Sequence, residues 1–174
     1  MGLIKSLIVF LIKLGVVSAI ATFGFLFAMG FADGPRGIVP GGAFQTGELV
    51  EGEPDWSFLK DRQEVEFQLL NPVGSRTAWI AEHDGRIFIP SGYMNSTLGK
   101  IWKHWPMDAE RDGRVILRVD GRLYPRHMVR IMNDPALDDV LNELNRKYFG
   151  GGRVADDIVE RGDLWVFELV PPRE

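Results

Sequence analysis

Small polar residues and one lysine gather where a strand is expected to lead into a short helix. The set consists of Ser91, Gly92, Asn95, Ser96, Thr97 and Lys100. Backbone amides at the start of a helix, with hydroxyl groups and an ammonium group beside them, can hold a phosphate or a carboxylate. The same residue types also serve as ordinary turn and cap residues. The sequence therefore leaves two interpretations of this stretch, an anion-binding site and a structural loop.

Two tryptophans, Trp102 and Trp105, follow this stretch directly, with Lys103 and His104 between them. Their rings could stack on a planar ligand, dock the domain at a membrane interface, or pack in the core. Further along, four arginines recur at a spacing of four, namely Arg118, Arg122, Arg126 and Arg130. With Arg76 they could form a basic stripe, or they could be solvated strand residues balanced by Asp112 and Asp120.

The composition of the chain excludes several classes of partner and of reactive site. The formal net charge of −4 and the pI near 5.4 argue against nucleic acid as a partner, because tracking phosphates requires a cationic surplus. The absence of cysteine excludes disulfides, thiolate metal sites, iron–sulfur clusters and a cysteine nucleophile. The three histidines lack the short spacing of a metal site, so we expect no bound metal. No hydrolase motif is present.

The N-terminal segment is apolar enough to cross a membrane. Residues 14–32 carry no charge and would rise about 28 Å as a helix, close to the thickness of a hydrocarbon core. A cleaved signal peptide is the alternative, and Gly30-Phe31-Ala32 is an acceptable cleavage site. Lys5 and Lys13 precede the run and acidic residues follow it, so the positive-inside rule places the N-terminus in the cytoplasm and the domain on the outer side.

Three regions follow from this pattern. Residues 1–32 are predicted to be a membrane anchor, residues 33–60 a Gly- and Pro-rich tether, and residues 61–174 one α+β domain. Strands are predicted at 64–69, 76–83, 86–90, 115–119, 123–131 and 164–170. Helices are predicted at 96–104, ended by Pro106, and after Asp134-Pro135.

The hairpins that join these strands predict a mostly antiparallel sheet. Asp84-Gly85 and Asp120-Gly121 are strong signals for two-residue turns. At the second turn the register stays open. A plain turn puts Arg122, Tyr124 and Arg126 on the face of Val115 and its alternating neighbours, whereas a one-residue bulge puts them on the other face. Six strands with two flanking helices fit a small barrel.

The order of elements resembles the split β-barrel flavoproteins, in particular the deazaflavin-dependent nitroreductase family. The resemblance is carried by RIFIPSG at 86–92, KIWKHWPMD at 100–108 and GRVILRVDGRLYPRHMVRI at 113–131. In that family a strand ends in a small-residue turn, a helix carries a tryptophan, and a hairpin follows. Where the family has a lysine-bearing turn that holds the cofactor phosphate, this chain has residues 71–76, with Arg76 and no lysine.

The resemblance implies a membrane-anchored redox protein that binds FMN or a deazaflavin. The cofactor phosphate would be held by Arg76, Ser91, Gly92 and Lys100, with Asn95 in the same loop, and Trp102 would wall the ring. It also implies a homodimer with the site at the subunit interface. The alternative is an accessory or assembly subunit of a larger membrane complex that uses the same fold without a cofactor. The turn without lysine and the outer location favour this second interpretation.

Overall fold

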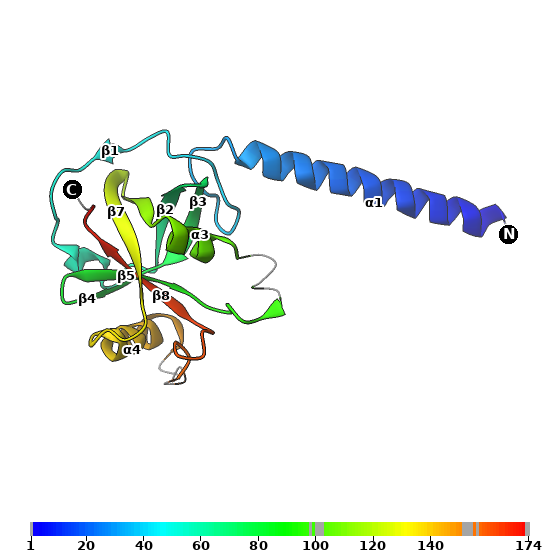
Figure 1. The fold of residues 1–174 in the computed structure, drawn as a ribbon. Coiled ribbons are helices and arrows are strands. Elements are labelled where there is room, and N and C mark those ends of the chain that lie inside the picture. Colours follow the sequence, from blue (N-terminus) through cyan, green and yellow to red (C-terminus); the bar gives the residue numbers. More distant parts are fainter. Residues whose placement is uncertain (1, 98, 100–102, 151–154, 156, 173–174) are drawn as a thin grey trace.

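The computed structural model describes residues 2–97, 99, 103–150, 155 and 157–172. The chain begins with one long helix, α1 (Gly2–Met29), which projects away from a compact sheet domain (Figure 1). Its 28 residues rise about 42 Å at 1.5 Å per residue. Only Met29, at the end nearest the domain, is buried. The helix is long and apolar enough to cross a membrane, a test that a signal sequence near the N-terminus also passes.

The domain is built on one curled sheet of eight strands. These are β1 (Glu48–Leu49), β2 (Glu64–Leu70), β3 (Val73–Trp79), β4 (Ala81–His83), β5 (Arg86–Ser91), β6 (Arg114–Val119), β7 (Arg122–Ile131) and β8 (Trp165–Val170). Their spatial order is β3-β2-β6-β7-β8-β5-β4, and every neighbouring pair along that path is antiparallel. The short β1 pairs with β7 in parallel. The predicted α+β class with a mostly antiparallel sheet is confirmed. The six predicted strands become eight because 76–83 is divided and β1 is added.

One bent stretch of chain connects the two edges of the sheet. The two edge strands, β3 and β4, are consecutive and separated only by Ile80, which is fully buried. β3 pairs with β2 and β4 pairs with β5, so the bend at Ile80 joins the two edges of the sheet.

Helix α4 (Leu137–Tyr148) holds the bend from outside. The Tyr148 hydroxyl accepts a hydrogen bond from the Ile80 N–H at 2.9 Å and donates to the Gln63 carbonyl. Its ring stacks on Trp79 with centroids 4.3 Å apart. Burial raises the pKa of the Tyr148 hydroxyl to about 12, because the charged form would lose its hydration. The helix predicted after Asp134-Pro135 is confirmed, but it begins at Leu137, and its cap residue is Ala136 rather than Asp134. The Asp134 carboxylate accepts from the Ala136 N–H at 2.9 Å in the turn that precedes the helix.

Two hydrophobic clusters form the core. One fills the inside of the curled sheet, with Phe67, Leu117 and Phe167 fully buried at its centre. The other lies between the sheet and α4, where Phe88, Val140 and Val166 are fully buried. The alternation predicted for the first strand is confirmed, because every second residue of β2 points into the first cluster.

The β6–β7 hairpin adopts the plain two-residue turn. Val119 lies opposite Arg122, Leu117 opposite Tyr124, and Val115 opposite Arg126. Tyr124 and Arg126 therefore share the core face, and only 5% of Arg126 is exposed. The Arg126 guanidinium lies 3.0 Å from the Glu53 carboxylate and over the Trp56 ring.

The arginines of this hairpin do not form one stripe. Arg118 pairs with Asp33 and Glu66, Arg126 with Glu53, and Arg130 with Glu110. The expected balance by Asp112 and Asp120 is wrong, because those carboxylates pair with Arg114 and Arg62. Sequence proximity did not reveal these partners because they come from separate parts of the chain, namely the segment after α1, the chain after β1, strand β2 and the helix that precedes β6.

Helix α3 (Trp105–Arg111) differs from the prediction. Pro106, which we expected to end a helix, lies in the first turn of α3. A proline is tolerated there because the N–H it lacks would have no partner inside the helix. The helix predicted at 96–104 includes residues 98 and 100–102, which lie outside the described part of the chain. A single 3₁₀ turn, η1 (Trp56–Leu59), covers the barrel with buried Trp56 and Leu59.

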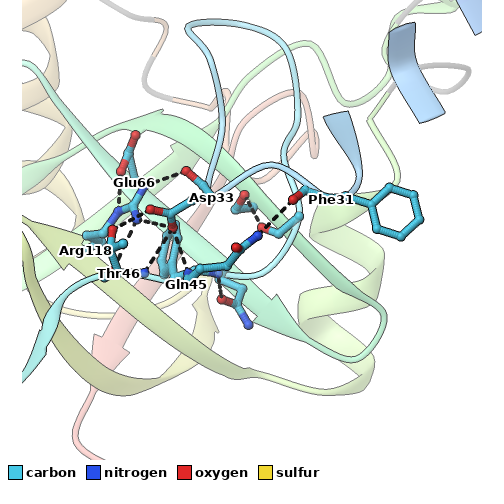
Figure 2. A network of polar contacts seen from close by, with 10 residues as sticks. Phe31, Asp33, Gln45, Thr46, Glu66 and Arg118 are labelled. Atoms are coloured by element: carbon cyan, nitrogen blue, oxygen red, sulfur yellow. Dashed lines mark hydrogen bonds and ion pairs between the residues drawn. The ribbon is translucent and has the colours of Figure 1, made fainter. Parts of the chain in front are cut away.

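A polar network binds the segment after α1 to the barrel (Figure 2). We call Arg118, Asp33, Thr46 and Glu66 the Arg118 clamp. The Arg118 guanidinium lies 2.7 Å from both the Asp33 and the Glu66 carboxylates, and it covers the Phe44 ring at 4.0 Å. Asp33 also accepts from the Thr46 hydroxyl and from the Gln45 N–H. These hydrogen bonds, first that of Thr46, hold the pKa of Asp33 well below its usual range.

Backbone contacts extend this attachment along β3. Gly41 exchanges two hydrogen bonds with Ser75, and the Ser75 hydroxyl donates to the Gly42 carbonyl at 2.6 Å. A Cβ atom on Gly41 would lie 1.8 Å from the Gly34 carbonyl oxygen, so only glycine fits. The Gly-rich segment therefore lies against the barrel over this stretch, while the domain division at residues 32 and 60 stays a prediction.

Replacing Arg118 should loosen this attachment. In Arg118→Ala, two carboxylates lose their cation, and we expect a loss of about 2 kcal/mol in the free energy of unfolding. Cleavage by a protease within residues 33–46 should become faster. The measurement is denaturant unfolding in detergent, combined with limited proteolysis. The control is Arg122→Ala, an exposed arginine of the same hairpin. Equal stability and equal cleavage in the two variants would contradict the role of the clamp.

Removing the Tyr148 hydroxyl should weaken the bend at Ile80. Tyr148→Phe keeps the ring stacked on Trp79 but leaves the buried Ile80 N–H without its partner, so we expect a loss of about 1 kcal/mol. Denaturant unfolding followed by tryptophan fluorescence measures this loss. Tyr93→Phe makes the same chemical change at a residue that is 76% exposed, and it should have no effect. If both variants unfolded like the unaltered protein, the hydroxyl would not support the bend.

Candidate functional site

A cleft of about 950 Å³ opens beside β3, the chain after β5, and the C-terminal end of α4. Its volume is within the range of pockets that bind small molecules and cofactors, about 300–1,000 Å³. The walls are mostly apolar. Their polar side chains are Arg76 and Thr77 of β3, Asn95 and Ser96 after β5, Lys103, and the two carboxylates Glu64 and Asp163. The bend at Ile80 and the packing of α4 therefore shape one side of this cleft, and the segment after α1 adds Gly37 and Ile38 to it.

Two cations line the cleft. Arg76, on β3, makes no hydrogen bond or ion pair with any residue that the structure describes. Burial lowers its pKa, and the charge of Asp108 partly offsets this. Lys103 donates from Nζ to the Gly92 carbonyl at 2.9 Å, and burial lowers its pKa too. Arginine keeps its charge in proteins, so Arg76 presents a partly desolvated positive charge to the cleft.

Aromatic rings form much of the remaining wall. Trp79 and Phe149 meet edge to face with centroids 5.9 Å apart, and Trp79 is 41% exposed. Tyr93 stands on the other side, largely exposed, with φ of +61°. That conformation is uncommon for a residue other than glycine, and such residues cluster at binding sites. Trp105 lies deeper and packs against Phe67, so it belongs to both the core and the cleft.

The predicted site residues are placed as follows. Arg76, Gly92 and Asn95 line the cleft. The Ser91 side chain is buried, and its hydroxyl donates to the Met94 sulfur, so it is not part of the lining. Lys100 and Trp102 lie outside the described residues. Whether these residues hold a ligand stays a prediction.

Two details of the predicted site change. The turn expected at 71–76 is shorter, because the strand predicted to begin at Arg76 already begins at Val73, and Arg76 therefore lies inside β3 rather than at its start. Asn95 binds the chain rather than facing freely into the cleft, since its amide donates to the Arg161 carbonyl at 2.7 Å and to Asp163. Asn95 thus fixes the loop that carries Gly92 and Tyr93.

Sequence reasoning did not assign Trp79, Tyr93, Lys103 or Phe149 to a site. Lys103 lies just after the candidate stretch at 91–100, and this position was a weak indication that it belongs to the site. Trp79 and Phe149 meet only because β3 bends and α4 packs back on it. No local pattern marks such a meeting.

No family model and no curated protein matches this chain. Among solved structures, a putative pyridoxamine 5'-phosphate oxidase from Listeria innocua is 15% identical, with a TM-score of 0.44 over 67% of this chain and 90% of that chain. A conserved hypothetical protein from Mycobacterium tuberculosis is 14% identical, with a TM-score of 0.47 over 72% of this chain and 84% of that chain. The strand arrangement described above, rather than this likeness, defines the fold. Membership of the deazaflavin-dependent nitroreductase family stays a prediction.

Proposed function

We propose that this protein is a membrane-anchored redox protein that binds a flavin or deazaflavin in the cleft. The observation that carries the proposal is the juxtaposition of two half-buried cations, Arg76 and Lys103, with exposed aromatic rings in one cavity of sufficient size. A flavin cofactor combines a planar apolar ring with an anionic phosphate. The cleft offers a complementary surface for each part.

The residues fit these two parts. Arg76 has no carboxylate in hydrogen-bond contact within the described chain, so a phosphate would supply the partner that its buried guanidinium lacks. Lys103 and the backbone around Gly92 would add donors on the opposite side. Trp79 and Tyr93 offer ring faces for stacking. Lys100 and Trp102 remain predicted contributors.

The redox chemistry would come from the cofactor, which accepts and donates a hydride or electrons when bound. The chain itself would bind the phosphate, orient the ring against the aromatic wall, and exclude water from one face of it. No side chain in this scheme has to act as a catalytic acid or base. The homodimer that the family resemblance implies would complete the cleft from a second subunit, and this also belongs to the proposal.

Helix α1 would anchor the domain. Its apolar surface is exposed along nearly its whole length in the isolated chain, and lipid would cover it. With Lys5 and Lys13 on the cytoplasmic side, the cleft would lie outside the cytoplasm.

Cofactor binding is tested with the full chain purified in mild detergent. We expect a visible absorption band at isolation, or tight uptake of FMN or a deazaflavin with quenched fluorescence. Arg76→Ala should weaken the affinity by about tenfold or more, because it removes a charge-assisted contact to phosphate. Arg122→Ala, which removes an exposed arginine outside the cleft, should leave the affinity unchanged.

Two outcomes would contradict the proposal. A folded, colourless protein that takes up neither cofactor would rule out cofactor binding, and its co-purification with a larger membrane complex would favour the accessory-subunit alternative. Equal cofactor affinity in Arg76→Ala and Arg122→Ala would show that the cleft does not hold the phosphate.

A further inference from the structure

The rim of the cleft carries exposed apolar side chains. We call Ile38, Trp79, Tyr93 and Phe149 the cleft rim; all four line the cleft, and they are 94%, 41%, 76% and 48% exposed. Single exposed apolar residues are ordinary on protein surfaces, but several around one opening mark an interaction surface. Trp79 is partly covered by Tyr148 and Phe149, and Ile38 and Tyr93 are the most exposed of the four.

The rim lies close to the base of α1. The chain between Met29 and Ile38 folds back on itself, because the Gly42 N–H donates to the Ala32 carbonyl at 3.2 Å. Arg36 and Val39 exchange two backbone hydrogen bonds and hold Ile38 in the turn between them. Ile38 therefore stands on a short, closed loop at the end of the apolar helix.

The chain that follows α1 is attached to the barrel. The Arg118 clamp ties Asp33, four residues after α1, to strands β2 and β6 (Figure 2). In Figure 1 the loop that follows β5, which carries Tyr93, projects from the barrel toward the same side as α1. A membrane crossed by α1 would therefore lie on the side of the domain where this loop and the Ile38 turn protrude.

We infer that the cleft rim docks on the surface of the lipid bilayer that α1 spans, so that the cleft opens at the lipid–water interface. The inference rests on the proposed anchoring. Lipid is the partner because Ile38, the most exposed residue of the rim, lies nine residues after α1, whose own apolar surface has no cover in the described chain. Tyr93 and Ile38 suit the lipid–water interface, where aromatic rings with a polar tip are enriched.

The absence of native cysteine makes this directly testable in the full chain. Single-cysteine variants carry an environment-sensitive fluorophore, and the protein is reconstituted into phosphatidylcholine–phosphatidylglycerol vesicles that contain nitroxide-labelled lipid. Ile38→Cys reports on the rim. Phe58→Cys is the matched control, a 46% exposed apolar residue of η1, which lies on the side of the barrel away from α1 (Figure 1). Val17→Cys, 62% exposed on α1, reports on anchoring.

We expect the label at position 38 to shift its emission to the blue and to lose fluorescence to nitroxides near the headgroups, while the label at position 58 does neither. If the label at position 17 is quenched but the labels at 38 and 58 both keep the emission and intensity that they have in water, docking is wrong and anchoring stands. No quenching at position 17 would overturn anchoring and docking together. Flavin uptake by the same samples reports separately on the cofactor proposal.

Discussion

The ion pairs of Arg118 join parts of the chain that are far apart in sequence. Asp33 lies 85 positions from Arg118 and four residues after the apolar helix, whereas Glu66 belongs to the first long strand. Because both carboxylates share one guanidinium, the end of α1, β2 and β6 are held at one point. Phe44 closes over the same guanidinium and excludes water from it. This attachment positions the Gly-rich segment, the Ile38 turn and one wall of the cleft.

A second constraint shapes the opposite wall. The bend at Ile80 sends one continuous stretch of chain along two edges of the sheet, and Tyr148 satisfies the backbone at that bend. Arg76 and Trp79 lie just before the bend, and both line the cleft. They lie on opposite faces of β3, since Arg76 is paired with the buried Phe67 and Trp79 with the exposed Glu64. The cleft is thus a consequence of barrel closure. Arg76, one of its two cations, has no carboxylate in hydrogen-bond contact in the described chain, and this supports the proposed anionic ligand.

Much of the fold could be predicted from local patterns, and much of the site could not. The apolar run predicted α1, and the alternation at 64–69 predicted the buried face of β2. Asp120-Gly121 predicted the hairpin of β6 and β7. The register of that hairpin could not be predicted, since Arg126 is a charged residue that the core accepts only because Glu53 and Trp56 come from elsewhere. Likewise, the residue types of the loop after β5 indicated a candidate site. They did not indicate Trp79, because only long-range packing brings it to the same cleft.

The central claim is that the barrel, and with it the cleft, is held in a fixed orientation relative to α1. The most direct measurement is the distance distribution between two nitroxide labels by pulsed electron paramagnetic resonance, in the full chain embedded in lipid nanodiscs. One label replaces Val17 on α1 and the other the exposed Asn142 on α4. The account predicts a single narrow distribution that broadens when Arg118 is replaced by alanine. A broad distribution with Arg118 in place would contradict it, because the domain would then move freely on its anchor.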